Sequence, residues 1–89
     1  MERIELDLRR LTSVANLHQH LYKTLALPKY YGCNLDALHD CLTERAEATE
    51  LVISARVTEE KYLGAYGEAL LQVLQDAAEE NPSLKVIIK

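Results

Sequence analysis

Hydrophobic and polar positions follow two different periods along the chain, and each change of period marks a predicted element. In residues 2–8 apolar side chains alternate with charged ones, which predicts a strand with one buried face. From Val14 onward leucines recur at spacings of three and four, which predicts a helix to about Leu27. Thr12 or Ser13 can cap its start, and Pro28 ends it.

A second helix is predicted to begin at Leu35. Before it, Pro28 and Gly32 indicate a loop, because proline cannot continue a helix and glycine can adopt backbone angles that other residues avoid. Asn34 is a suitable N-cap, since its side-chain oxygen can accept from a free N–H of the first turn. One face of this helix is apolar and comprises Leu35, Leu38, Leu42 and Ala46.

The opposite face of the second helix is acidic. At roughly 100° per residue its carboxylates fall within an arc of about 80°. Like charges at these spacings repel each other by a few tenths of a kcal/mol per pair. An ordinary solvated helix face and a binding surface for a cationic partner both fit this pattern. The residues of the arc are Asp36, Asp40, Glu44 and Glu47.

The second half of the chain predicts two more strands and at least one helix. Residues 51–53 are a short apolar run typical of a buried strand. Thr58 and the two glutamates after it resemble a helix start, and Gly64 and Gly67 divide this stretch into a short and a longer helix. The longer helix ends before Pro82, and residues 84–88 form the last strand.

Strands separated by helical crossovers predict a parallel sheet. We therefore expect an α/β fold in which a three-stranded parallel sheet packs against three or four helices. The length of 89 residues fits one domain, residues 1–89.

The charge balance limits the classes of partner. Fourteen acidic residues against ten basic ones give a net charge of −4, which argues against a nucleic-acid binder and is compatible with a basic protein partner. No run is long enough to span a bilayer, and the charged start does not resemble a signal peptide, so no membrane association and a cytoplasmic location are expected.

The cysteines and histidines predict neither a metal nor a cofactor. Cys33 and Cys41 are too few for a disulfide framework and do not form a C-x-x-C pair, so we expect thiols, Cys33 the more exposed and Cys41 half-buried. His18 and His20 point in different directions on a helix, which does not favour a shared metal ion. We expect His18 to pack or cap locally.

Residues 30–43, YYGCNLDALHDCLT, closely resemble the barstar family of intracellular ribonuclease inhibitors. The match extends upstream through residues 17–19 and 25–28 and reappears weakly at 71–73. It implies a three-stranded parallel sheet with helices and a 1:1 complex with a basic, barnase-type ribonuclease. In such a complex the acidic helix and its loop offer carboxylates to the cations that bind substrate phosphates.

The resemblance also implies roles for individual residues. Asp40 matches the central carboxylate, which mimics a substrate phosphate. Tyr30 and Asn34 match contacts made by the loop. Asp36 and Thr43 match the polar contacts that flank Asp40.

Five further residues complete the predicted binding surface. Gly32 and Ala37 match places where close approach needs small side chains. Asp76 matches an acidic contact from the last helix, with a side chain one methylene shorter. His39 and Glu44 lie on the acidic helix and are included in the predicted binding surface.

The chain departs from the family at several of these positions. His39 and Arg45 stand where the family has tryptophans, and the chain contains no Trp. Cys33 replaces an acidic residue. Because aromatic anchors often carry much of the binding energy, the cognate target is open. An immunity protein or adaptor that binds a different basic toxin shares every feature above.

An enzyme is the remaining alternative. His39 could act as a general base, with the adjacent Asp40, or Asp36 one turn earlier, as its orienting carboxylate. Adjacent helix residues diverge, however, and the chain has no glycine-rich phosphate loop, metal motif or nucleophile elbow. We therefore predict that the protein is not an enzyme. Nothing in the sequence suggests self-association, so we also expect a monomer when free.

Overall fold

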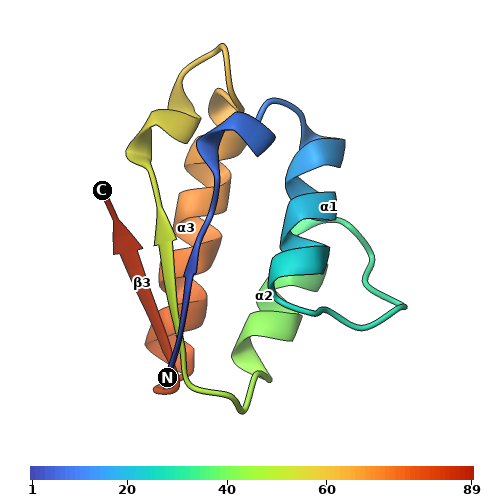
Figure 1. Cartoon of the computed structure of the whole chain (residues 1–89), viewed down its shortest axis with the longest axis vertical. Coiled ribbons are helices and arrows are strands. Elements are labelled where there is room, and N and C mark those ends of the chain that lie inside the picture. Colours follow the sequence, from blue (N-terminus) through green and yellow to red (C-terminus); the bar gives the residue numbers. More distant parts are fainter.

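The structure, a computed structural model, describes residues 1–89. Three strands, β1 (Glu2–Glu5), β2 (Thr49–Ile53) and β3 (Leu84–Ile88), form one parallel sheet in the order β1-β2-β3 (Figure 1). The helices are α1 (Val14–Thr24), α2 (Leu35–Thr43) and α3 (Ala65–Glu80), with short 3₁₀ helices η1 (Leu8–Arg10) and η2 (Ala55–Thr58). The predicted α/β fold with a three-stranded parallel sheet is confirmed.

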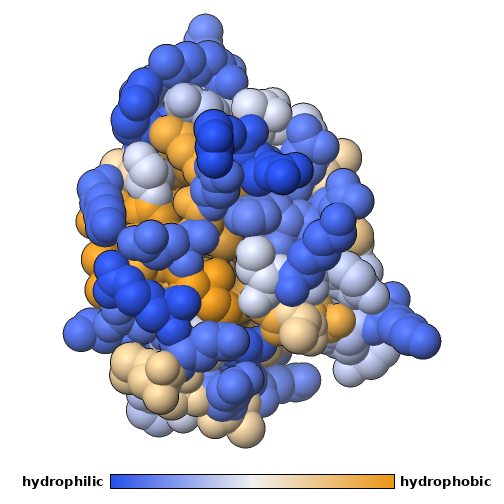
Figure 2. All heavy atoms as spheres, in the orientation of Figure 1, coloured by the Kyte–Doolittle hydropathy of each residue, from blue (hydrophilic) through white to orange (hydrophobic).

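The sheet has one face buried by helices and one face covered by charged side chains. Ile4, Leu51 and Ile53 belong to the core, together with leucines from all three helices. On the other face Arg3 pairs with Glu50, and Lys89 Nζ lies 3.4 Å from Glu5 Oε1. Parallel sheets are usually covered by helices on both faces. Here the other face has no helix over it, and Figure 2 shows hydrophilic side chains lying over hydrophobic ones at the left.

The first two predicted elements end earlier than expected. β1 stops at Glu5 rather than Leu8, because the Asp7 carboxylate accepts from the Arg9 N–H at 3.0 Å and turns the chain into η1. α1 begins as predicted, with Ser13 Oγ accepting from the Asn16 N–H at 3.1 Å. It ends at Thr24 rather than Leu27, since Ala26 takes a left-handed φ of 50°.

The acidic helix α2 is also shorter than its apolar pattern implied. Glu44 is its C-cap residue, so Ala46 and Glu47 lie beyond it. Glu47 is therefore not part of the acidic helix face, and its carboxylate lies 3.5 Å from Arg45 Nη2.

The helix prediction after β2 was wrong in two respects. No helix begins at Thr58, which instead ends η2, and turns follow to Gly64. Gly67 does not break a helix but lies inside α3, where an added Cβ would be 2.2 Å from the Val57 carbonyl oxygen. Its small size therefore permits α3 to pack closely on η2. Gly64, with a φ of 56°, does precede α3.

Candidate partner-binding surface

The loop before α2 is fixed to the helix start by Asn34. Its Oδ1 accepts from the Ala37 N–H at 2.8 Å, and its Nδ2 donates to the Gly32 carbonyl at 3.2 Å. The left-handed residue of this loop is Cys33, with a φ of 54°, and not Gly32 as expected. Gly32 is needed for space, because an added Cβ would be 3.2 Å from Asn34 Nδ2 and 3.3 Å from Ala37 Cβ.

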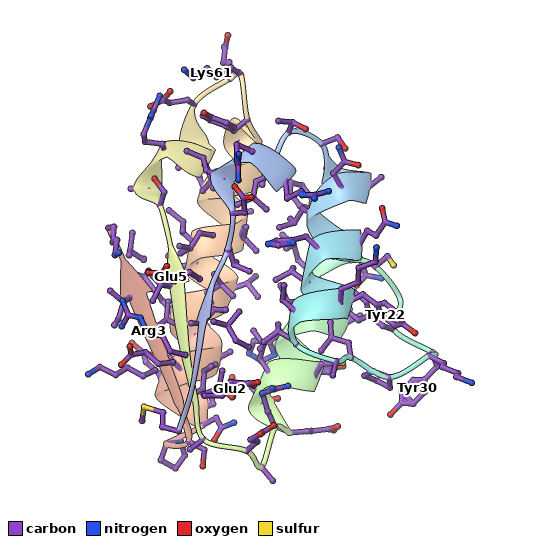
Figure 3. All side chains as sticks on the ribbon, in the orientation of Figure 1. Glu2, Arg3, Glu5, Tyr22, Tyr30 and Lys61 are labelled. Carbon is purple, nitrogen blue, oxygen red and sulfur yellow. The ribbon has the colours of Figure 1, made fainter.

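The same loop is anchored to the core through His18. His18 Nδ1 lies 2.6 Å from the Tyr31 hydroxyl, and its Nε2 lies 2.8 Å from the Tyr66 hydroxyl. Burial lowers the pKa of His18 and raises the pKa of Tyr31. The expectation that His18 packs locally is confirmed. Tyr30 is left outside this contact at 82% exposure, at the tip of the loop in Figure 3.

The other end of α2 is held by two inward-facing polar side chains. Asn81 Nδ2 donates to the carbonyls of Leu42 and Arg45, each at 2.8 Å. The Arg45 guanidinium donates to the Leu25 carbonyl at 2.7 Å and to Thr49 Oγ1 at 2.8 Å. With only 13% of its side chain exposed, Arg45 mainly stabilises the fold.

The solvent-facing side of α2 carries carboxylates that no cation neutralises. Asp36, Asp40 and Glu44 are exposed on the side opposite the buried Leu38 and Leu42. Asp36 and Glu44 make no ion pair, and Asp40 Oδ1 comes no closer than 3.9 Å to His39 Nδ1. The Asp40 side chain is 79% exposed. These carboxylates are free to meet cations of another molecule.

Two hollows lie beside this acidic face, with Tyr30 on the border of both. One has a volume of about 360 Å³ and is lined by Tyr30, Tyr31, Gly32, Ala37, Asp40, Cys41 and Glu44. The other, of about 280 Å³, is lined by Tyr30, Cys41, Glu44, Arg45 and residues 26–28. The structure thus brings five of the predicted site residues together around one hollow.

Of the five remaining predicted residues, Asp36 makes no side-chain hydrogen bond or ion pair, and the other four are engaged within the chain. Thr43 Oγ1 donates to the Asp40 carbonyl at 3.1 Å, and Asn34 is occupied by the capping contacts. Asp76 lies exposed on α3, where it accepts from Gln72 Nε2 at 2.9 Å. His39 reaches across to α3, where its Nε2 lies 2.6 Å from Glu80 Oε2.

Glu80 is a surface residue that the sequence reasoning missed. It is exposed, lies one helical turn after Asp76, and is joined through His39 to the helix that carries Asp40. The spacing of four between Asp76 and Glu80 was the available signal. The acidic surface therefore extends from α2 onto the last turn of α3.

No three of the His, Cys, Asp and Glu side chains converge in a way that could hold a metal ion. None of the helices is both long enough and apolar enough to span a bilayer.

Both cysteines are free thiols, Cys33 exposed and Cys41 half-buried, as predicted. Burial raises the pKa of the Cys41 thiol, which makes it a poor nucleophile.

A family model described as Barstar (barnase inhibitor) matches residues 1–89. The chain belongs to the barstar family. A relative from Bacillus subtilis (strain 168), named "Putative ribonuclease inhibitor YrdF", is 38% identical over 91 residues, with 100% of each chain covered. Membership of the barstar family indicates an inhibitor rather than an enzyme and supports ribonuclease inhibition in general.

Proposed function

We propose that the protein inhibits a basic, barnase-type microbial ribonuclease by covering its active site in a 1:1 complex. The proposal places α2 and the loop from Tyr30 to Asn34 at the centre of the interface. It also includes a cytoplasmic location. A monomeric free state is part of the proposal, since the net charge of −4 makes copies of the chain repel one another.

The chemistry is set by the substrate that a ribonuclease must bind. This substrate carries a phosphate at each step, so the cleft presents cationic side chains. A carboxylate placed where a phosphate would lie forms charge-assisted hydrogen bonds with the same cations. Asp40 is the best placed to do so, because it is the most central exposed carboxylate of α2 and borders the hollow beside Tyr30.

The observation that carries the proposal is the set of unpaired carboxylates on α2. In this family member Asp36, Asp40 and Glu44 share one exposed helix face. Of the eleven other carboxylates of the chain, six pair with an arginine or a lysine, as Glu50 does with Arg3 and Glu59 with Arg56. A helix face that keeps its charge free is suited to a cationic partner.

One observation favours a second candidate, an immunity protein or adaptor for a different basic toxin. His39 and Arg45 stand where the family has tryptophans, and both side chains contact other parts of the chain. His39 contacts the exposed Glu80, and Arg45 contacts the Leu25 carbonyl. Tyr30 is then the one large aromatic side chain left exposed at this surface. A target that needs fewer aromatic contacts would fit this arrangement.

The test is a titration of RNA cleavage by a barnase-type ribonuclease. We expect wild type to inhibit at a 1:1 ratio and Asp40→Ala to weaken inhibition at least about 100-fold, because removing one member of a buried charge pair costs about 3 kcal/mol. The matched control is Glu60→Ala, which removes an exposed, unpaired carboxylate far along the chain from α2.

Circular dichroism melts would establish that all three proteins are folded. Inhibition by folded Asp40→Ala as tight as that of wild type would refute the phosphate-mimic role. A folded wild-type protein that inhibits no ribonuclease of this type would instead favour the second candidate.

A further inference from the structure

The charges of this acidic protein are segregated along the chain. Residues 8–35 contain no Asp or Glu but four basic residues, Arg9, Arg10, Lys23 and Lys29. All fourteen acidic residues lie in the rest of the chain. The segment without acidic residues comprises η1, α1 and the loop before α2. Part of the surface is therefore basic although the protein as a whole is not.

A polar cavity lies between η1 and α1, which contact each other, and seven of its eight lining residues come from the segment without acidic residues. Its volume is about 490 Å³, and no hydrophobic residue lines it. Figure 2 shows hydrophilic side chains over this part of the molecule. The α1 side of the cavity comes from one stripe of the helix at spacings of three and four. The lining residues are Asp7, Arg9, Arg10, Asn16, Gln19, His20, Lys23 and Thr24.

The cavity has more positive than negative charge. Asp7 is its one carboxylate, and Arg9 occupies both oxygens, with Nε 3.1 Å from Oδ1 and Nη2 3.1 Å from Oδ2. These contacts lower the pKa of Asp7, so it stays ionised beside Arg9. Arg10 and Lys23 pair with no carboxylate, although six of the ten basic residues in the chain do. Their two charges remain available.

The uncharged lining groups add hydrogen-bond donors. His20 Nε2 accepts from the Asp7 N–H at 3.2 Å, so the neutral ring carries its proton on Nδ1, where it has no partner within the chain. Burial lowers the pKa of His20, which favours this neutral form. The Gln19 amide also has no hydrogen-bond partner in the chain. Donors therefore outnumber free acceptors in the cavity.

We propose that this cavity binds a small phosphorylated anion of the pyrophosphate type. Guanidinium, ammonium and amide donors are the groups that bind phosphate oxygens. The volume falls in the range of small-molecule sites. No hydrophobic side chain lines the cavity and His20 is its one aromatic ring, so it offers little on which a nucleobase could stack. The site shares no residue with the hollows beside Tyr30, so it is separate from the ribonuclease-binding surface.

The experiment is calorimetric titration of the whole protein with pyrophosphate at physiological ionic strength. We expect saturable 1:1 binding. The double variant Arg10→Gln/Lys23→Gln should raise the Kd at least tenfold. The matched control Lys85→Gln removes an exposed, unpaired lysine from β3 and should leave the Kd unchanged.

Two further readouts make the result decisive. In ¹⁵N–¹H spectra, pyrophosphate should shift the amides of Arg10 and His20 and not those of α2. Thermal melts should show that both variants are folded. The proposal is overturned by absence of saturable binding, by equal Kd values for the double variant and the control, or by a single-stranded oligonucleotide binding more tightly than pyrophosphate.

Discussion

His18 has both ring nitrogens within hydrogen-bond distance of tyrosine hydroxyls, Tyr31 on one side and Tyr66 on the other. A ring with one proton can donate to one hydroxyl and accept from the other. A second proton would place a charge in the core and remove the acceptor, which is why burial lowers the pKa of His18. This single residue thereby fixes Tyr31 and the loop that presents Tyr30.

The lowered pKa of His18 predicts a loss of stability in mild acid. In the unfolded chain histidine titrates near about pH 6.5, so between that pH and the lower folded pKa the unfolded state binds more protons. The stabilising contribution of neutral His18 to the free energy of unfolding should therefore be complete above about pH 6.5 and should decrease as the pH falls below it.

Urea denaturation of wild type and His18→Gln at pH 7.5 and 5.5 would measure this effect. Because the pKa of His20 is lowered too, the variant isolates the part due to His18. We expect wild type to lose more stability than His18→Gln over this interval. An equal loss in both proteins would contradict the prediction.

At the scale of elements, α2 is a short helix of nine residues whose two ends are held by asparagines. Asn34 caps its first turn through the Ala37 N–H. The buried Asn81, from the end of α3, donates to carbonyls in and just after its last turn. These contacts fix the direction of α2, and with it the acidic face.

Removing either asparagine should destabilise the fold by a different amount. Asn81→Ala removes the donor to the Arg45 carbonyl and leaves the Leu42 carbonyl with backbone donors alone, so we expect a loss of about 1–3 kcal/mol in the free energy of unfolding. Asn34→Ala removes an exposed N-cap and should cost about 1 kcal/mol. Urea denaturation measures both, and an Asn81→Ala protein as stable as wild type would refute this account of α2.

The sequence predicted the strands and helices because each has an apolar face with a clear period. It did not predict where β1, α1 and α2 end, because these ends depend on single contacts. Asp7 turns the chain after β1, and Ala26 ends α1 with a left-handed backbone. Gly67 appeared to be a helix breaker because its reason, the approach of Val57, comes from a separate element.

The candidate surface was predictable to a similar extent. The acidic face of α2 follows from periodicity, and the resemblance assigned its residues. Periodicity does not show which side chains fold inward. Arg45 turns to the Leu25 carbonyl and His39 to Glu80, and both contacts join residues distant in the sequence.

At the scale of the whole molecule, the charges form two regions. Carboxylates gather on α2 and on the last turn of α3, where Glu80 adjoins His39. The cations without partners include Arg10 and Lys23 beside the cavity between η1 and α1. Such a separation gives the molecule an electric dipole, which would orient an approaching basic enzyme toward the acidic face.

The central claim is that the acidic face occupies the phosphate position of a ribonuclease active site. The most direct measurement is the affinity of the protein for a barnase-type ribonuclease at increasing concentrations of a 3′-mononucleotide that occupies the same active site. If the carboxylates replace a phosphate, the apparent Kd should rise in proportion to the nucleotide concentration once this exceeds the nucleotide's own Kd. An apparent Kd that does not change with nucleotide concentration would contradict the account, because the protein and the phosphate would then bind at separate places.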